Sequence, residues 1–187
     1  ATNALLERKG ARVLLMITEG FGDLLEIGYQ TRPDLFAMQI SRPELLYDTV
    51  VEVAERLDAA GRVLTALELS RARADMEAAH AAGVRSIAIA LLHAYLNPIH
   101  EQQLAQLAAE LGFSQVSTSH EVSGLAKLVG RGDTTVVDAY LSPILRRYVD
   151  QVAGALNIGG NCKALMFMQS NGGLTDARKF QGKDAIL

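Results

Sequence analysis

The chain has 187 residues, of which 49% are hydrophobic and 21% charged, so it can build the core of one ordinary domain and is not a disordered segment. Its formal net charge is −3 and its Lys and Arg residues form no block, which argues against nucleic acid or an anionic membrane as the main partner. The one cysteine, Cys162, excludes an internal disulfide, and no apolar run is long enough to cross a membrane. We therefore expect a cytoplasmic globular protein.

The first third of the chain predicts one buried strand between two helices. A helix is predicted over residues 2–9, and an almost continuous apolar run follows over 11–18. Such a run is typical of a strand buried on both faces, as in a parallel sheet. Thr18 is expected to cap the short helix that comes next. Residues 30–48 show no period and are interpreted as an extended excursion.

A small β-hairpin insertion is predicted next. Valines alternate with glutamates over residues 50–55, and the segment 58–61 has the composition of a turn that leads into residues 62–64. An amphipathic helix capped by Ser70 is then expected over residues 70–82.

The rest of the chain alternates between predicted strands and helices. The expected elements are a strand at 84–95, a helix opened by Asn97 and Pro98, a strand at 114–119, a helix from 133 or 134 to about 156 that is kinked or restarted at Pro143, and a strand at 164–169. This order indicates an α/β fold with a mixed or mostly parallel layered sheet and flanking helices.

Two polar groups are candidates for binding an anion. Thr2 and Asn3 stand at a predicted helix start, where side chains cap free N–H groups and where a phosphate or carboxylate can also bind. Ser170, Asn171, Gly172 and Gly173 follow the last predicted strand and could bring backbone N–H groups to an anion, although a plain tight turn explains the pattern equally well.

Two histidine-containing groups follow predicted strands. His93 and His100 lack a helical metal spacing, so a structural role is favoured over a ligand role and no metal site is predicted. A Ser119-His120-Glu121 catalytic triad is disfavoured, because adjacent residues of an extended chain point apart. The residues themselves assign no catalytic group.

Several stretches together resemble the N-terminal region of the hydantoinase A/oxoprolinase family. They are TEGFGDLLEIGYQ at 18–30, RPELLYD at 42–48, LLHAYLNPIHEQQ at 91–103 and MQSNGGL at 168–174, in order and with compatible spacing. Within the family, LVGRGDTTVVDAYLSP at 128–143 is most similar to the ATP-dependent 5-oxoprolinases.

The resemblance implies an actin-like (ribonuclease H-like) ATPase fold, with ATP and Mg²⁺ as cofactors. It further implies opening of 5-oxo-L-proline to L-glutamate within glutathione metabolism. The implied partners are the remainder of the polypeptide or a hydantoinase B-like protein. The intact protein is expected to form a homo-oligomer. Residues 1–187 are then part of the N-terminal region, and 134–187 begin the following hydantoinase A domain. The chain opens directly in a helical sequence and stops at an apolar end without a cap, which leads us to interpret it as a piece of a longer polypeptide. The family's phosphate loops are expected outside that piece.

Alternatives remain open within and beyond this class. Within it stand an N-methylhydantoinase and a carboxylase subunit, and beyond it stands a non-catalytic binding or assembly module.

Arg131 lies between Gly130 and Gly132 just before the predicted helix start, so a tight turn is expected there. Its side chain is expected to face a polar cleft and contribute to anion recognition, with a solvated loop arginine as the alternative.

Overall fold

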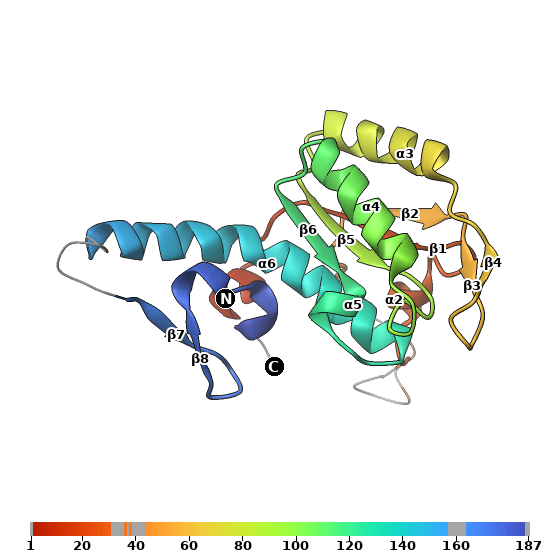
Figure 1. Cartoon of the computed structure of the whole chain (residues 1–187). Helices are drawn as coiled ribbons and strands as arrows, with labels where there is room; N and C mark the ends of the chain where they lie inside the picture. The colour runs from red at the N-terminus through yellow and green to blue at the C-terminus, as the bar shows by residue number, and fades with distance from the viewer. Residues whose placement is uncertain (1, 31–35, 37, 39–43, 157–163, 186–187) are drawn as a thin grey trace.

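The centre of the molecule is a four-stranded sheet in the order β2-β1-β5-β6, in which every neighbouring pair is parallel (Figure 1). The strands are Thr49–Val53 (β2), Val13–Thr18 (β1), Ser86–Ala90 (β5) and Gln115–Thr118 (β6). This computed structural model describes residues 2–30, 36, 38, 44–156 and 164–185.

The two central strands are buried on both faces. Every residue of β1 and β5 is buried, which is why their sequences are apolar without alternation. The strands predicted at 11–18, 84–95 and 114–119 are confirmed, as is the parallel α/β class. The structure ends β5 at Ala90, because the chain turns at His93, where φ is 60°.

Helices cover both faces of the sheet (Figure 1). On one face α3 (Leu69–Ala81) and α4 (Ile99–Glu110) pack against the side chains of β1 and β5. On the other face lie α1 (Thr2–Leu6), α2 (Leu24–Ile27) and the long helix α6 (Leu128–Ala155). A further short helix, α5 (Ser119–Val122), follows β6 directly. The sequence did not predict it.

The predicted small β-hairpin insertion is confirmed, but the position predicted for its first strand is wrong. Its first strand is β2, which pairs with β1 as a parallel edge strand of the main sheet. The hairpin that does form is shorter and joins β3 (Arg56–Leu57) to β4 (Val63–Thr65) around the turn ending at Gly61. Burial increases along β2 from exposed Thr49 to buried Val53 and does not alternate, so the alternating sequence pattern over residues 50–55 is a misleading guide to pairing.

The last predicted strand does not join the main sheet. Instead β7 (Met166–Met168) pairs antiparallel with β8 (Leu174–Asp176) in a separate two-stranded sheet. With 28 residues, α6 is roughly 42 Å long at about 1.5 Å per residue, and its C-terminal part carries the chain past the sheet (Figure 1). Two 3₁₀ turns, η1 (Ala177–Lys179) and η2 (Gly182–Asp184), then bring the chain back against α6.

Several predicted helix ends are also wrong. Thr18 caps no helix, since it is the last residue of β1, and the residue before α2 is Asp23. Ser70 lies inside α3, which follows Glu68. The helix α1 ends before Arg8, whose φ is 54°, rather than at the predicted residue 9. The helix α6 continues through Pro143. It also runs without a break through residue 134. The start of a second domain at that residue stays a prediction.

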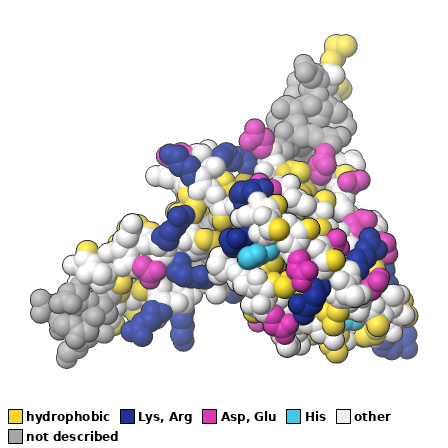
Figure 2. Space-filling view, turned by 90° about the horizontal axis from the view of Figure 1, so that it is seen from above, with side chains coloured by type: hydrophobic (Ala, Val, Ile, Leu, Met, Phe, Trp, Pro, Cys, Tyr) yellow, Lys and Arg dark blue, Asp and Glu magenta, His cyan; other side chains and the backbone are white. Residues whose placement is uncertain are grey.

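The surface carries both signs of charge. Figure 2 shows acidic and basic side chains intermingled over the sheet and its helices, while Lys and Arg predominate on the arm that extends to the left. Exposed cations of that arm include Arg146, Arg147, Arg178 and Lys179. Among the described residues, no helix has both the length and the apolar character needed to cross a membrane.

The contact between η2 and α6 depends on the absence of a side chain at Gly182. A Cβ atom there would lie 2.9 Å from the backbone oxygen of Asp138 and 3.0 Å from its Cα. Because backbone cannot move aside, Gly182→Ala is expected to lower the free energy of unfolding by roughly 1–3 kcal/mol in urea denaturation. Gly154→Ala is the control, since nothing lies within 4 Å of its Cβ position in α6, and it should not destabilise. Equal stability of both variants would contradict the close packing.

Candidate functional site

Buried polar side chains gather where the parallel strands end. In open α/β sheets, ligands bind at the carboxyl ends of the strands, so this edge is the first place to look for a site. The buried polar residues here are Thr18, Glu55, His100, Glu101, Thr118, Ser119 and Arg131.

The carboxylate of Glu101, in the first turn of α4, is the centre of this group and is fully buried. One of its oxygens, Oε1, accepts from the Leu91 N–H at 2.9 Å and from the Ser119 hydroxyl. The other, Oε2, accepts from the backbone N–H of His120 at 3.0 Å and lies 2.6 Å from His120 Nδ1. Four donors therefore compensate the cost of burying the charge.

Arg131 supplies the buried positive charge beside this carboxylate. Its guanidinium donates to Ser119 Oγ at 2.8 Å, to the Leu125 carbonyl at 3.0 Å and to the Leu91 carbonyl. It also lies 5.4 Å from the centre of the Tyr95 ring, within cation–π range. Burial lowers the pKa of Arg131 from its ordinary value, and the charge of Glu101 opposes that change.

The expectation for Arg131 is therefore corrected. It lies inside α6, which begins at Leu128, and it is fully buried rather than placed in a tight turn beside an open cleft. Gly130 and Gly132 made a turn look favourable, but Gly132 instead lies where α6 packs closely on α2: a Cβ there would lie 2.9 Å from Leu25 Cδ2. Arg131 links β5, α5 and α6 from within.

A second buried carboxylate joins the neighbouring strands. Glu55 accepts from the Thr18 hydroxyl and lies 2.7 Å from His100 Nδ1, so the structural role favoured for His100 agrees with its contacts. Thr18 Oγ1 also accepts from the N–H of Leu92 at 2.8 Å. The ends of β1, β2 and β5 are thereby tied together.

The segment Ser119-His120-Glu121 forms no triad, as expected. Ser119 and His120 both turn to Glu101, and Glu121 is exposed. The hydrogen bond to Glu101 is the main reason that the pKa of His120 is raised from 6.5, and burial opposes it. Sequence reasoning did not predict the buried roles of Glu101 and Glu55, because their partners come from distant segments.

His93 differs from the other histidines of this edge. Its backbone is left-handed, with φ of 60°, and its Nδ1 is buried without a hydrogen-bond partner. Its ring centre lies 6.2 Å from that of Tyr95, whose side chain is 36% exposed. Thr118 Oγ1, at the end of β6, is likewise buried without a partner.

The other predicted site residues lie elsewhere. Thr2 and Asn3 are exposed in the first turn of α1. Residues 170–173 form the turn between β7 and β8, and Figure 1 shows that hairpin well separated from α5 and the carboxyl edge. The N–H groups of Ser170, Gly172 and Gly173 already donate to Asp184 O, Gln169 O and Asn171 Oδ1. The structure thus shows a tight turn here, and anion binding by any of these residues stays a prediction.

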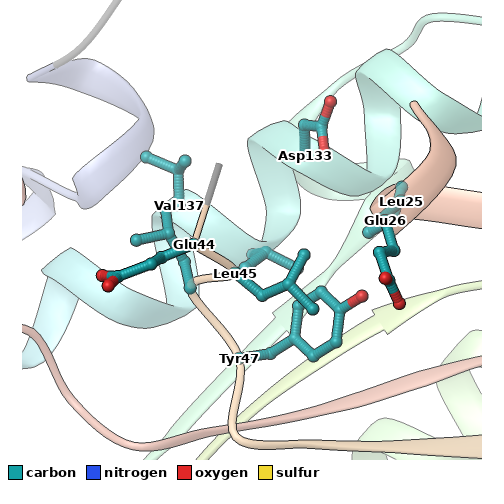
Figure 3. Close-up of a pocket in the computed structure, with 9 residues that line it drawn as sticks. Leu25, Glu26, Glu44, Leu45, Tyr47, Asp133 and Val137 are labelled. Carbon is teal, nitrogen blue, oxygen red and sulfur yellow. The ribbon is translucent and has the colours of Figure 1, made fainter. Parts of the chain in front are cut away.

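A separate pocket of about 300 Å³ lies between α2, α6 and residues 44–47 (Figure 3). Its walls include Leu25, Leu45 and Val137, and its polar groups are Glu26, Glu44, Asp133 and Tyr47. Burial and the nearby carboxylates of Glu26, Asp133 and Asp23 raise the pKa of Tyr47, and loss of surrounding water raises that of Asp133. Because its charges are negative, this pocket does not suit a carboxylate or phosphate ligand.

The turn at 170–173 and Arg131 do not offer free donors for the nucleotide that the resemblance implies. Among the described residues, no group of three or more His, Cys, Asp and Glu side chains could hold a metal ion. The glycine turn at 170–173 uses its N–H groups internally, and Arg131 is enclosed. No step involving ATP or Mg²⁺ can therefore be assigned to a residue of this region.

Comparison with known proteins identifies the class. A family model described as the hydantoinase/oxoprolinase N-terminal region matches residues 1–112, and one described as hydantoinase/oxoprolinase matches residues 131–187. The chain therefore belongs to the hydantoinase/oxoprolinase family. It is 38% identical over its full length to the 5-oxoprolinase of Saccharomyces cerevisiae and covers 17% of that protein. It is 36% identical over its full length to 5-oxoprolinase 1 of Arabidopsis thaliana and covers 16% of that protein.

Solved structures share the fold. The ATP-dependent caprolactamase of Pseudomonas jessenii superposes with a TM-score of 0.88 at 29% identity, over 98% of this chain and 28% of that one. The chain spans about one sixth of the length of the 5-oxoprolinases it matches. The recognised family and the parallel α/β class are both confirmed.

Removal of the Arg131 guanidinium should destabilise the fold. Arg131→Ala leaves the Ser119 hydroxyl, the buried Leu91 carbonyl and the Leu125 carbonyl without their donor, and removes the guanidinium charge from beside Glu101. We expect the free energy of unfolding to fall by about 3 kcal/mol in chemical denaturation. Arg147→Ala, at an exposed position of the same helix, is the control and should change it little. Two variants of equal stability would show that the buried contacts contribute nothing.

The His120–Glu101 contact should make stability depend on pH. Because the folded-state pKa of His120 is raised above 6.5, its contribution is complete below that pH and is lost as the pH rises through the folded-state pKa. The difference in unfolding free energy between the parent and His120→Asn should therefore be larger near about pH 5.5 than near about pH 8.5. Urea denaturation at both values measures it. A difference that is constant with pH would mean that the imidazole has the same pKa in the folded and unfolded states.

Proposed function

We propose that the intact protein is an ATP-dependent amidohydrolase that opens a cyclic amide, with 5-oxo-L-proline as substrate and L-glutamate as product. The observation that supports this most is full-length similarity at 36–38% identity to proteins named 5-oxoprolinase. The likeness to an ATP-dependent caprolactamase supports the broader class, since caprolactam is also a cyclic amide.

This region contributes a rigid layer. The edge at which its parallel strands end is proposed to face the reacting groups of the substrate. Its loops are fixed there by two buried carboxylates, Glu55 and Glu101, and by Arg131, so polar groups at this edge hold their positions without solvent reorganisation. ATP and Mg²⁺ are proposed to bind to other parts of the intact protein. The remainder of the polypeptide, or a hydantoinase B-like protein, is the proposed partner.

A carboxylase subunit is the second candidate. The acetophenone carboxylase gamma subunit of Aromatoleum aromaticum is 28% identical over 96% of this chain, which covers 27% of that protein. Acetone carboxylase has the same fold, with a TM-score of 0.77 at 24% identity, a level that supports the fold alone. Lower identity than to the 5-oxoprolinases places this candidate second.

The two readings separate in a substrate assay. The intact protein, with any partner subunit, is assayed for ADP release with 5-oxoproline, with N-methylhydantoin, and with a methyl ketone plus bicarbonate. The expected result is a higher kcat/KM for 5-oxoproline than for N-methylhydantoin, and no ketone-dependent ADP release. A preference for the hydantoin would move the assignment to N-methylhydantoinase, and ketone-dependent turnover would move it to a carboxylase.

A further inference from the structure

The loop after β5 carries two local costs at one residue. His93 has φ of 60°, in the left-handed region that a non-glycine residue adopts only when its surroundings impose it. In addition, its Nδ1 is enclosed with no hydrogen-bond partner, which leaves a polar atom desolvated and uncompensated. Both costs fall at the edge of the sheet where ligands of this fold class bind.

The surroundings of His93 are built to hold this conformation. The N–H of Leu91 donates to Glu101, its carbonyl accepts from Arg131, and the N–H of Leu92 donates to Thr18. On the other side, the carbonyl of His93 accepts from the N–H groups of Leu96 at 2.9 Å and of Asn97 at 3.2 Å. The loop is therefore fixed on both sides of the strained residue.

The other left-handed residues lack this support. Arg8 and Gln30, each with φ of 54°, are exposed and follow the short helices α1 and α2, where a chain commonly leaves a helix through a left-handed residue. Among the described non-glycine residues, His93 alone combines a positive φ with an unpaired buried ring nitrogen. Its conformation therefore needs a different explanation.

We propose that His93 is a substrate-binding residue, whose imidazole forms a hydrogen bond with the amide group of the cyclic substrate; this rests on the proposed function. A neutral imidazole has its donor and its acceptor on different sides of the ring, so one ring nitrogen can bond to either the N–H or the C=O of a cyclic amide. Tyr95 lies beside it, with its ring held against Arg131 and its side chain partly exposed, and provides an apolar surface for the substrate ring.

The substitution His93→Asn separates binding from structure. Asparagine tolerates the left-handed backbone better than histidine does, so the melting temperature should stay the same or rise. The shorter side chain withdraws the imidazole, so KM for 5-oxoproline should rise about tenfold while kcat changes less, as expected for one lost hydrogen bond to substrate. His93→Gly is the second variant, because glycine adopts this φ without strain. Gln30→Asn is the matched control, because it also places asparagine at a left-handed position, but at an exposed one. It should not change KM.

All four proteins are made as the intact polypeptide and assayed by ADP release, with melting temperatures measured in parallel. The proposal is overturned if the His93 variants keep the parental KM, or if their activity and melting temperature fall together, since the histidine would then be structural. If the parent turns over 5-oxoproline and the His93 variants do so with the parental KM, only this inference fails. If the parent opens no cyclic amide at all, the proposed function fails before any variant is compared, and the inference fails with it.

Discussion

The buried charges of Glu101 and Arg131 set the arrangement of the whole carboxyl edge. Removing a carboxylate and a guanidinium from water is costly, and the cost is offset only if nearly every donor and acceptor of the two groups is used. Glu101 is satisfied by groups from the end of β5 and from α5, and Arg131 by groups from the end of β5, from α5 and from the loop that precedes α6. A shift of any of these elements would leave a buried charge uncompensated, so they hold one position.

This constraint explains how a strained residue can persist. The loop that contains His93 begins at Leu91, whose N–H and C=O are both taken by the buried charged groups. The backbone therefore leaves β5 in a fixed direction, and the left-handed turn at His93 follows from that direction. Strain of this kind is stable only where the surroundings determine it completely, and the Glu101–Arg131 arrangement provides that condition.

The parts of the fold that could be predicted are those that depend on local pattern. Buried parallel strands such as β1 and β5 are apolar throughout, and the helices between them show their period and their glycine ends. The parts that could not be predicted depend on partners far away in the chain. Whether β2 pairs with β1 or with a hairpin neighbour, and whether β7 joins the main sheet, cannot be read from segments of a few residues.

The roles of the candidate site residues could not be predicted either where they depend on partners far away in the chain. Arg131 was identified as important, but two flanking glycines suggested a turn, whereas Gly132 in fact allows α6 to approach Leu25 closely. Glu55 was missed because a carboxylate that accepts from Thr18 and His100 has no signature at its own position. Charge and spacing locate candidate residues, but only the fold shows which of them are enclosed and which can meet a ligand.

The same pair of charges also bears on how the chain divides. The two family models meet this chain at residues 1–112 and 131–187, so Glu101 falls in the first and Arg131 is the first residue of the second. A boundary between independent units normally runs where few contacts cross it. Here the contacts that cross it are the buried ones: Arg131 bonds to Leu91 of the first region, and α6 covers β1 and β5. In this structure the family's two sequence regions therefore share one core at this point.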